Sequence, residues 1–375
     1  MIAFANLLER LAYTPARNAK LRLMVEYFRA TPDPDRGWAL AALTDGLAVR
    51  FPARRTLLEL IEPRVDAELY RLSRDYVGDT AETVALLWPE PKAAAGRAMP
   101  PSLGEIADTL ALIGRGQLGA QLATWLDALD ANGRWALLKL LTGAPRVGVS
   151  ARLAKTALAQ WAARANPEVT VDDIEEVWHA LTPPYAPLFA WCAGTGPRPD
   201  VSGAPVFRPL MLSHALEADD LDTLVLADFS IEWKWDGIRI QIACGGGTTR
   251  LYSRTGEDIG AAFPDIAEHW PGSRRAEGVF DGELLIVRDG DVAPFADLQK
   301  RLNRKSVTAL LRKQQPAHVR LYDALMIGGE DLRTLPFVER RARLEAWHVA
   351  AAPPRTDLSA LVEACWQPLS DEARA

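Results

Sequence analysis

The sequence has few of the residues from which disulfide frameworks and zinc sites are built. Only three of its 375 residues are cysteine and five are histidine. Cys192, Cys244 and Cys365 are far apart and form no C-x-x-C pair, and no histidine has a second histidine or a cysteine at ligand spacing. This pattern argues against a disulfide-stabilised secreted fold and against a zinc site. We expect the cysteines to be buried free thiols.

Long hydrophobic runs are also missing. No apolar segment approaches the roughly 20 residues that a membrane-spanning helix needs, and Glu9 and Arg10 interrupt the N-terminal segment before it could form a signal peptide. Hydrophobic residues nevertheless make up 49% of the chain and charged residues 25%, as in folded globular proteins. We therefore expect a cytoplasmic protein, without membrane association, that is long enough for two or three domains.

No sign of charge dominates the sequence. The net charge is -6, and the first 200 residues carry 22 basic and 23 acidic side chains, so overall electrostatics does not by itself indicate a nucleic-acid-binding protein. Only eight of the 43 basic residues are lysine and the rest are arginine, whose planar guanidinium group suits phosphate. Lysine is scarce enough for each one to be considered singly.

Hydrophobic periodicity divides the chain near residue 194. Before that point apolar residues recur at helical spacing, with a capping box at Ser102 and Glu105 and another helix start at Thr170. Residues 194–209 are rich in glycine and proline, and alternation at 238–242, 279–287 and 319–327 then predicts strands. We predict an all-α domain over 1–193, a linker over 194–209 and an α+β domain with antiparallel sheets over 210–375.

The segment 232–239 (EWKWDGIR) places Lys234 at a strand end, between two tryptophans and two carboxylates. A lysine that loses its proton is a nucleophile, although burial and neighbouring carboxylates shift its pKa in opposite directions and the sequence leaves the outcome open. Taken alone, this pattern favours an ordinary surface lysine in a hairpin. Further polar clusters follow at 252–258 (YSRTGED), 280–284 (FDGEL) and 320–323 (RLYD), each at a predicted strand or its end.

In this order and at these separations the four segments resemble the ATP-dependent DNA ligases of the bacterial multi-domain type. These enzymes belong to the covalent nucleotidyltransferases, together with RNA ligases and capping enzymes. The resemblance covers essentially the whole chain, because residues 1–190 look like the helical DNA-binding domain of the family. It implies an enzyme that seals nicks in duplex DNA during replication, repair or recombination, through a lysyl-AMP intermediate and with ATP and Mg²⁺ as cofactors. We expect a monomer.

The resemblance also implies roles for individual residues. Lys234 matches the lysine that forms the phosphoramidate with AMP, Glu232 matches the glutamate that recognises adenine, and Tyr322 takes the place of an aromatic residue that stacks on the base. Arg239 and Arg254 match arginines that hold ribose and phosphate. Glu283 matches the carboxylate near ribose and metal. Asp281 is expected as a second metal carboxylate and Glu257 as a supporting carboxylate.

A second predicted contact is the run 145–150 (PRVGVS), which matches a DNA-binding segment of the family and leads into a helix. Arg146, Gly148, Ser150 and the following Lys155 are the residues implied. The run also makes independent sense, because Ser150 can cap that helix and the free amides at a helix N-terminus suit a DNA phosphate.

The sequence departs from the family at its end. The ligases continue with an E-G-x-x-x-K segment, further lysines and an OB-fold, whereas residues 348–375 contain no lysine. We therefore expect a C-terminally incomplete ligase without an OB-fold, either a fragment or a natural remnant. It should bind nucleotide weakly, adenylate itself slowly if at all, and not seal nicks unless the rest of the protein is supplied. An RNA ligase or capping enzyme, and a non-catalytic DNA-binding remnant, stay open as alternatives.

Overall fold

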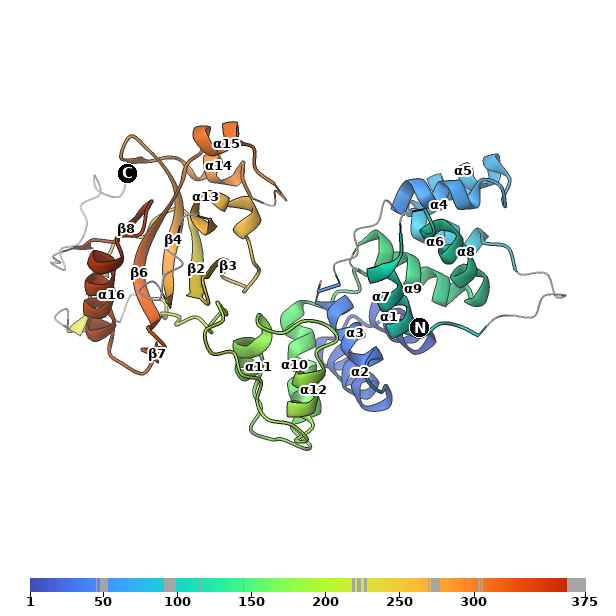
Figure 1. Cartoon of the computed structure of the whole chain (residues 1–375), viewed down its shortest axis with the longest axis horizontal. Coiled ribbons are helices and arrows are strands. Elements are labelled where there is room, and N and C mark those ends of the chain that lie inside the picture. The colour runs from blue at the N-terminus through green and yellow to red at the C-terminus, as the bar shows by residue number, and fades with distance from the viewer. Residues whose placement is uncertain are drawn as a thin grey trace. The chain divides into compact units, whose positions relative to one another are not determined.

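The structure is a computed structural model that describes residues 1–362 except 45, 48–52, 91–98, 115, 144, 218–219, 221–223, 226–227, 269, 271–276, 303 and 305. Cys365 and the end of the predicted second domain lie outside these residues. The chain forms two compact units, drawn from blue to green and from green to red in Figure 1. The first comprises Met1–Ile174 and Leu181–Pro199, and the second comprises Glu175–Ala180 and Asp200–Ala375. The predicted linker is thus shared between the units.

The described secondary structure of the first unit is helical. Its elements are α1 (Ile2–Ala12), α2 (Arg17–Ala30), α3 (Asp35–Leu43), α4 (Ala53–Ile61), α5 (Ala67–Val77), α6 (Thr80–Leu87), α7 (Leu103–Leu112), α8 (Leu118–Ala128), α9 (Ala131–Thr142), α10 (Ala151–Ala162), α11 (Val171–Trp178) and α12 (Ala186–Cys192). Helix α11 runs through the division between the units, since its last four residues group with the second.

Local capping explains where several of these helices begin. The predicted capping box of α7 is confirmed, because the Ser102 hydroxyl accepts from the backbone N–H of Glu105 at 3.0 Å and the Glu105 carboxylate accepts from that of Ser102 at 2.6 Å. Aromatic packing then joins distant helices, with the rings of Phe28 and Trp161 each edge-on to that of Phe189. Among the described residues of this unit, no helix is long and apolar enough to cross a membrane.

The second unit is built around a sheet in the order β3-β2-β4-β6-β7. Its strands are β1 (Ile231–Glu232), β2 (Ile238–Gly245), β3 (Thr248–Ser253), β4 (Gly278–Arg288), β5 (Asp291–Val292), β6 (Ala317–Ile327), β7 (Glu330–Asp331), β8 (Thr356–Leu358) and β9 (Leu361–Val362). Its remaining helices are the 3-10 turn Gly260–Ala262, α13 (Pro264–Ala267), α14 (Phe295–Gln299), α15 (Ala309–Gln314) and α16 (Phe337–Ala351). Gly246 and Gly247, both with positive φ, form the turn between β2 and β3.

The two faces of this sheet differ in composition. One face carries Ile240, Phe280 and Leu321 and packs against residues of α13, α14 and α16, so the main hydrophobic core lies here. The opposite face has a smaller apolar cluster around Tyr252 and Leu325 at one end. Its other end carries charged side chains, which the alternation of each strand places on this face.

Parallel pairing corrects the prediction of purely antiparallel sheets. Strand β8 pairs with β6 in parallel, with Arg320 opposite Asp357, whereas β2, β3, β4 and β6 pair antiparallel. Helix α16 connects β6 to β8 and returns the chain to the end where β6 began, as a parallel pair requires. A three-residue strand next to Pro353 and Pro354 is too short to show alternation in the sequence.

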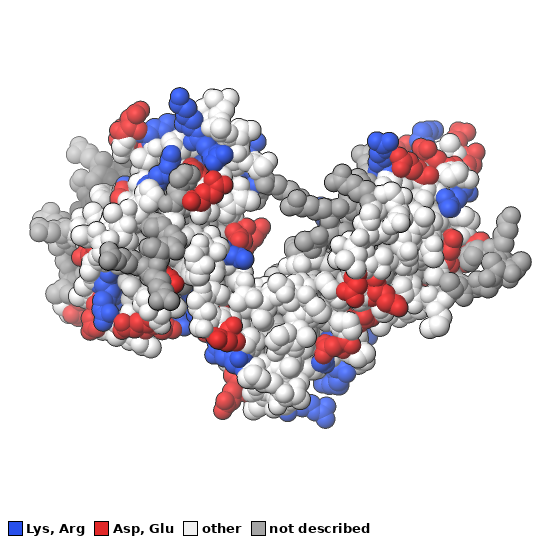
Figure 2. Space-filling model, viewed as in Figure 1, with Lys and Arg blue, Asp and Glu red and all other residues white. Residues whose placement is uncertain are grey.

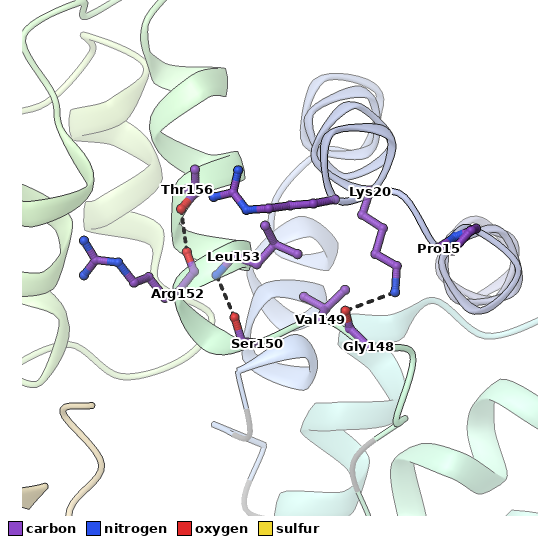
Figure 3. A pocket seen from close by; sticks show the side chains of 9 residues that line it. Pro15, Lys20, Gly148, Val149, Ser150, Arg152, Leu153 and Thr156 are labelled. Atoms are coloured by element: carbon purple, nitrogen blue, oxygen red, sulfur yellow. Dashed lines mark hydrogen bonds between the residues drawn. The ribbon is translucent and has the colours of Figure 1, made fainter. Parts of the chain in front are cut away.

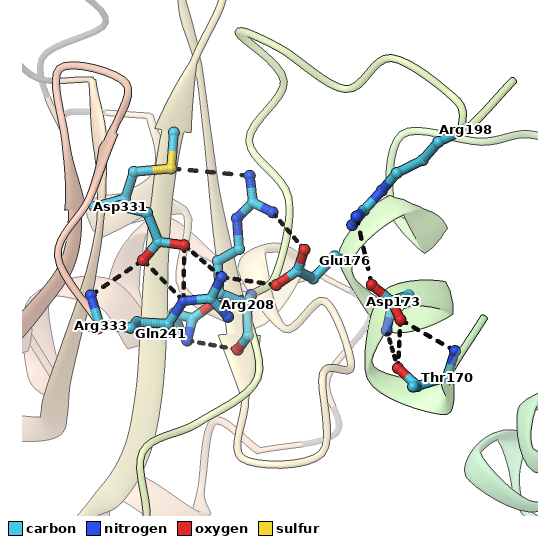
Figure 4. A network of polar contacts seen from close by, with 9 residues as sticks. Thr170, Asp173, Glu176, Arg198, Arg208, Gln241, Asp331 and Arg333 are labelled. Carbon is cyan, nitrogen blue, oxygen red and sulfur yellow. Dashed lines mark hydrogen bonds and ion pairs between the residues drawn. The ribbon is translucent and has the colours of Figure 1, made fainter. Parts of the chain in front are cut away.

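Polar contacts fix the segments that lead into the sheet. Glu176, near the end of α11, forms ion pairs with Arg333 at 2.7 Å and with Arg208 at 3.4 Å (Figure 4). The backbone of Arg208 exchanges two hydrogen bonds with the side-chain amide of Gln241, at 2.6 and 3.1 Å.

Both Cys192 and Cys244 are buried free thiols, as expected.

Candidate active site

Side chains from neighbouring strands converge on the charged end of the sheet. In the β2–β4 ladder Arg239 lies opposite Glu283, and Gln241 lies opposite Asp281. Since side chains two residues apart share a face, these four point to the same side. Strand β6 adds Tyr322 where the register shifts between Asp281 and Gly282. A bulge adds an unpaired residue and redirects the strand locally, which is how an aromatic side chain joins this cluster.

Arg239 is held by a buried carboxylate. One of its terminal nitrogens donates to Asp281 Oδ2 at 2.7 Å and to the backbone oxygen of Met211 at 2.8 Å. Gln241 donates to the other oxygen of Asp281 at 3.1 Å. Asp281 is 1% exposed, and burial raises its pKa while Arg239 opposes that rise. Both oxygens of Asp281 are therefore committed to holding Arg239 and Gln241.

Glu283 is a second carboxylate of the cluster whose pKa is raised. Burial raises its pKa to about 7, against the attraction of Arg239, a hydrogen bond from the backbone of Gly237 and the charge of Lys234. Asp236 pushes in the same direction as burial. A carboxyl group with this pKa changes its protonation state near neutral pH, so it can release a proton or accept a cation there.

Tyr322 completes the cluster as a neutral ring. The guanidinium carbon of Arg239 lies 5.8 Å from its ring centroid. Burial raises the pKa of the phenol, as do the nearby carboxylates of Asp281, Glu283 and Glu232, so Tyr322 stays protonated at physiological pH. The ring is half-buried and has a charged neighbour on the polar side of the sheet.

The loop 233–237 brings Lys234 to this end of the sheet. Lys234 itself is exposed, between the exposed Trp233 and the half-buried Trp235. Gly237 explains why the loop can approach so closely, because a Cβ there would lie 2.5 Å from the backbone oxygen of Leu284 and 2.8 Å from Cγ of Glu283. Only glycine fits at this contact. Gly237 therefore sets the distance between the Lys234 loop and β4.

Glu232 precedes Lys234 in the chain and lies in β1. This two-residue strand pairs with β9, with Glu232 opposite Leu361. Burial raises the pKa of Glu232, while a hydrogen bond with Ser359 and the charge of Arg341 lower it. Sequence reasoning missed both Ser359 and Arg341, because neither stands in a recognisable pattern and each is brought here only by the chain's return after β6.

Arg254 and Glu257 follow the β2–β3 ladder, and Arg254 comes directly after Ser253, the partner of Ile240. Both are exposed in the turn that follows β3. Ser253 organises this turn, since its backbone N–H donates to the Glu257 carbonyl at 2.8 Å and its hydroxyl accepts from the Glu257 N–H at 3.2 Å. In the described part of the chain the turn is not joined to the Arg239 cluster by hydrogen bonds.

Comparison with known proteins gives a family match within the second unit. Residues 210–362 match the family model described as an ATP dependent DNA ligase domain. This segment is a domain of the ATP-dependent DNA ligase family. It contains the Lys234 loop, the polar face of the sheet and the return segment through β9.

Curated relatives extend the similarity beyond this ligase domain. The DNA ligase of Thermococcus fumicolans is 26% identical over 371 residues, which are 91% of this chain and 64% of that protein. A probable DNA ligase of Anaeromyxobacter dehalogenans is 32% identical over 65% of this chain and 47% of its own length. DNA ligase 1 of Korarchaeum cryptofilum is 27% identical over 62% of this chain and 41% of its own length. The chain thus spans about two-fifths to just under two-thirds of these relatives.

A second candidate site lies in the helical unit, outside the ligase domain. A cavity of about 640 Å³ beside the N-terminus of α10 is lined by Arg17, Lys20, Gly148, Ser150 and Arg152, among others (Figure 3). Ser150 caps α10, because its hydroxyl accepts from the backbone N–H of Leu153 at 3.2 Å. The structure thus places two of the predicted residues, Gly148 and Ser150, in one cavity wall.

The other two predicted DNA contacts differ from each other. Arg146 is exposed on the same loop, with a positive φ of 47°. Lys155 is only 5% exposed, so its side chain lies inside the helical unit rather than on its surface. The sequence did not single out Lys20, which is 7% exposed and donates from Nζ to the carbonyl oxygen of Gly148 at 3.0 Å. Lys20 therefore holds the loop that carries Arg146.

Proposed function

We propose that this chain acts in ATP-dependent DNA ligation and that Lys234 becomes covalently linked to AMP. The observation that carries the proposal is the close approach of the Lys234 loop to β4 at Gly237, which brings the lysine to the face where Arg239, Glu283 and Tyr322 gather. This arrangement occurs within the segment that matches the ligase domain.

The proposed chemistry begins with the Lys234 amine. Nζ, once deprotonated, attacks the α-phosphorus of ATP; a P–N bond forms, the P–O bond to pyrophosphate breaks, and pyrophosphate leaves. AMP then passes to the 5′-phosphate of a nick, and the 3′-hydroxyl of the nick displaces AMP as the phosphodiester forms. Negative charge on the phosphoryl oxygens is stabilised by fixed positive groups. Arg239 is such a group, because Asp281 and Met211 hold its guanidinium in place.

The remaining residues are assigned by their surroundings. Glu232 reads the adenine and Tyr322 stacks on it, since Tyr322 lies near Glu232 as well as near Arg239 and Glu283. Asp281 acts through Arg239 rather than on the nucleotide, because both its oxygens are already bonded. Arg254 is exposed and follows Ser253, the partner of Ile240 beside Arg239, so it is assigned with Arg239 to the ribose and phosphate; Glu257 supports the same exposed turn.

Magnesium fits this site through Glu283. Among the described residues no group of three or more histidine, cysteine, aspartate or glutamate side chains could hold a metal alone. Mg²⁺ is commonly held by one or two carboxylates together with substrate phosphates, however, so the Glu283 carboxylate and the triphosphate are a suitable set. Asp281 is a poor second ligand because Arg239 and Gln241 occupy its oxygens. The ion would neutralise charge on the phosphates.

Duplex DNA is the proposed partner of the helical unit. On the surface visible in Figure 2, acidic and basic side chains are interspersed rather than separated. Contact with phosphate is therefore assigned to the local group around α10, where exposed Arg17 and Arg152 line the cavity at the helix N-terminus and exposed Arg146 lies on the loop before it. Such contacts position a protein on DNA without reading sequence, which suits an enzyme that must act at any nick.

The decisive experiment is covalent labelling of the 375-residue chain with ATP radiolabelled at the α-phosphate, in the presence of Mg²⁺, followed by denaturing electrophoresis. Label should remain on the wild-type protein and be absent from Lys234→Arg, because arginine keeps the charge but cannot deprotonate. Lys300→Arg is the matched control on an exposed lysine of the same unit. Label on Lys234→Arg would refute the assignment, and an unlabelled wild type would favour the non-catalytic alternative.

A further inference from the structure

The chain returns to the Lys234 loop through its last described segment, residues 356–362. After α16, β8 pairs in parallel with β6, and the Ser359 N–H then donates to the Leu321 carbonyl at 2.8 Å. Two residues later β9 pairs with β1, with Val362 opposite Ile231. This return segment therefore contacts both the sheet and the strand that enters the Lys234 loop.

Ser359 occupies the centre of these contacts and is fully buried, with 0% of its surface exposed. Its hydroxyl accepts a hydrogen bond from the indole N–H of Trp235 at 3.1 Å. Its carbonyl oxygen accepts from the Arg341 guanidinium at 2.8 Å. Because a serine hydroxyl has one proton to donate, and the indole N–H can only donate, that proton is available for the Glu232 carboxylate.

Trp235 is fixed from its other side as well. The guanidinium carbon of Arg320 lies 4.0 Å from the Trp235 ring centroid, an arrangement that favours cation–π attraction. Asp357 of the return segment holds that guanidinium in a bidentate ion pair, at 2.8 and 2.6 Å. The tryptophan that follows Lys234 is thus held by Ser359 and by the Arg320–Asp357 pair.

We propose that Ser359 is a positioning residue for nucleotide transfer, whose hydroxyl links Glu232 to Trp235 and thereby sets the base-reading carboxylate and the Lys234 loop in one fixed arrangement. This inference rests on the proposed function, because it assigns Ser359 a part in ATP selection by the same site. Ser359 does not touch the reacting atoms. It acts through Glu232 and Trp235, which flank the nucleophile in sequence.

The groups around Glu232 make its pKa sensitive to the hydrogen bond from Ser359. Burial raises the pKa of this carboxyl, and the charge of Asp323 on β6 acts in the same direction. The Ser359 hydroxyl and Arg341 on α16 oppose them, while Tyr322 faces Glu232 from β6 as a neutral phenol. Removing the hydroxyl therefore leaves a partly buried carboxylate with one partner fewer, which favours its protonation at higher pH.

The test compares wild type with Ser359→Ala and the matched control Thr356→Val. Thr356 lies on the same return segment, and its hydroxyl donates to the Pro354 carbonyl rather than to the Lys234 loop. The affinities for ATP and GTP are measured by calorimetry across pH 5.5–8.5. Ser359→Ala should weaken ATP binding about tenfold or more and GTP binding much less, and should move the acid limb of ATP binding to higher pH. Thr356→Val should change neither.

A second variant guards against misfolding of Ser359→Ala, which is checked by circular dichroism and thermal unfolding. Trp235→Phe keeps an aromatic ring under Arg320 but removes the indole N–H. It should slow formation of the covalent AMP adduct at saturating ATP about three- to tenfold while preserving the preference for ATP over GTP. An unchanged rate in Trp235→Phe, or an unchanged ATP preference in folded Ser359→Ala, would overturn the inference.

The same measurements separate this inference from the proposed function. If the wild-type chain binds ATP no better than GTP, the proposed function fails and the role of Ser359 fails with it. If the wild type discriminates between the nucleotides and Ser359→Ala discriminates equally well, the proposed function stands and only the role of Ser359 is refuted.

Discussion

The polar end of the sheet and the N-terminus of α10 hold their charges in opposite ways. At the sheet Arg239 is paired with Asp281, a carboxylate that is 1% exposed, and burial shifts several pKa values. Around α10 the arginines are exposed, and the buried Lys20 is used to brace a loop. A fixed, partly dehydrated charge suits one small ligand in one orientation, whereas exposed charges suit a long polyanion that must be held at any sequence.

The largest expected effect is on stability at the sheet. Asp281→Ala removes the partner of a half-buried guanidinium, so it should lower the free energy of unfolding of the second unit by about 3 kcal/mol, as for other broken buried pairs. Glu59→Ala removes the partner of Arg55 in a solvent-exposed pair and should change the free energy of unfolding very little. Urea unfolding of both variants provides the measurement. Equal losses would show that burial does not distinguish the Arg239–Asp281 pair from an exposed ion pair.

Gly237→Ala tests the close approach of the Lys234 loop. The added Cβ would meet the Leu284 carbonyl and Glu283, so the loop must move away from β4. Covalent labelling with AMP should fall about tenfold to a hundredfold, because small displacements of a nucleophile are costly. Gly114→Ala is the matched control, since a Cβ at that position meets nothing within 4 Å among the described residues. Full labelling of Gly237→Ala would remove the geometric basis of the site.

The raised pKa of Glu283 predicts that stability at the sheet depends on pH. With a folded-state pKa of about 7 against an ordinary 4.5, the folded protein binds this proton more tightly than the unfolded chain. Stability from this group is therefore present at low pH and is lost as pH rises from 4.5 through 7. Glu283→Gln should be more stable than wild type at pH 8 by about 1–2 kcal/mol, and no more stable at pH 4.5.

Activity should show the opposite trend, since only the charged carboxylate attracts Mg²⁺. Labelling with AMP should rise between pH 6 and 8 in the wild type, and Glu283→Gln should lack that rise and label weakly throughout. Unfolding curves and labelling rates at each pH provide the two measurements. If neither the free energy of unfolding nor the labelling rate of the wild type changed near pH 7, the assignment of Glu283 would be contradicted.

The smallest expected effects belong to the α10 region. Arg146→Ala should weaken binding to nicked duplex DNA only a few-fold and lower the slope of log affinity against log salt by about 1, because one phosphate contact is lost. Lys155→Met should leave that slope unchanged, since the side chain is 5% exposed. Fluorescence anisotropy at several salt concentrations provides the measurement. A reduced slope in Lys155→Met would restore it as a direct DNA contact.

Sequence patterns predicted the local elements well and the long-range ones poorly. Alternation at 238–242 predicted β2, because this signal depends on neighbouring residues. Strands β8 and β9 have only three and two residues and were not predicted. Their pairing depends on residues far away in the chain, and no local pattern encodes such a partner.

The sequence by itself determined which side chains are available for the proposed chemistry: a scarce lysine between two tryptophans, followed by arginines, carboxylates and a tyrosine at strand ends. Tertiary structure alone decided how they are used. It buried Asp281 behind Arg239, raised the pKa of Glu283, left Arg254 on an exposed turn and brought Ser359 against Trp235. Residue identity fixes which groups can ionise or donate, but burial and partner distance set the free energy of doing so, and both arise only on folding.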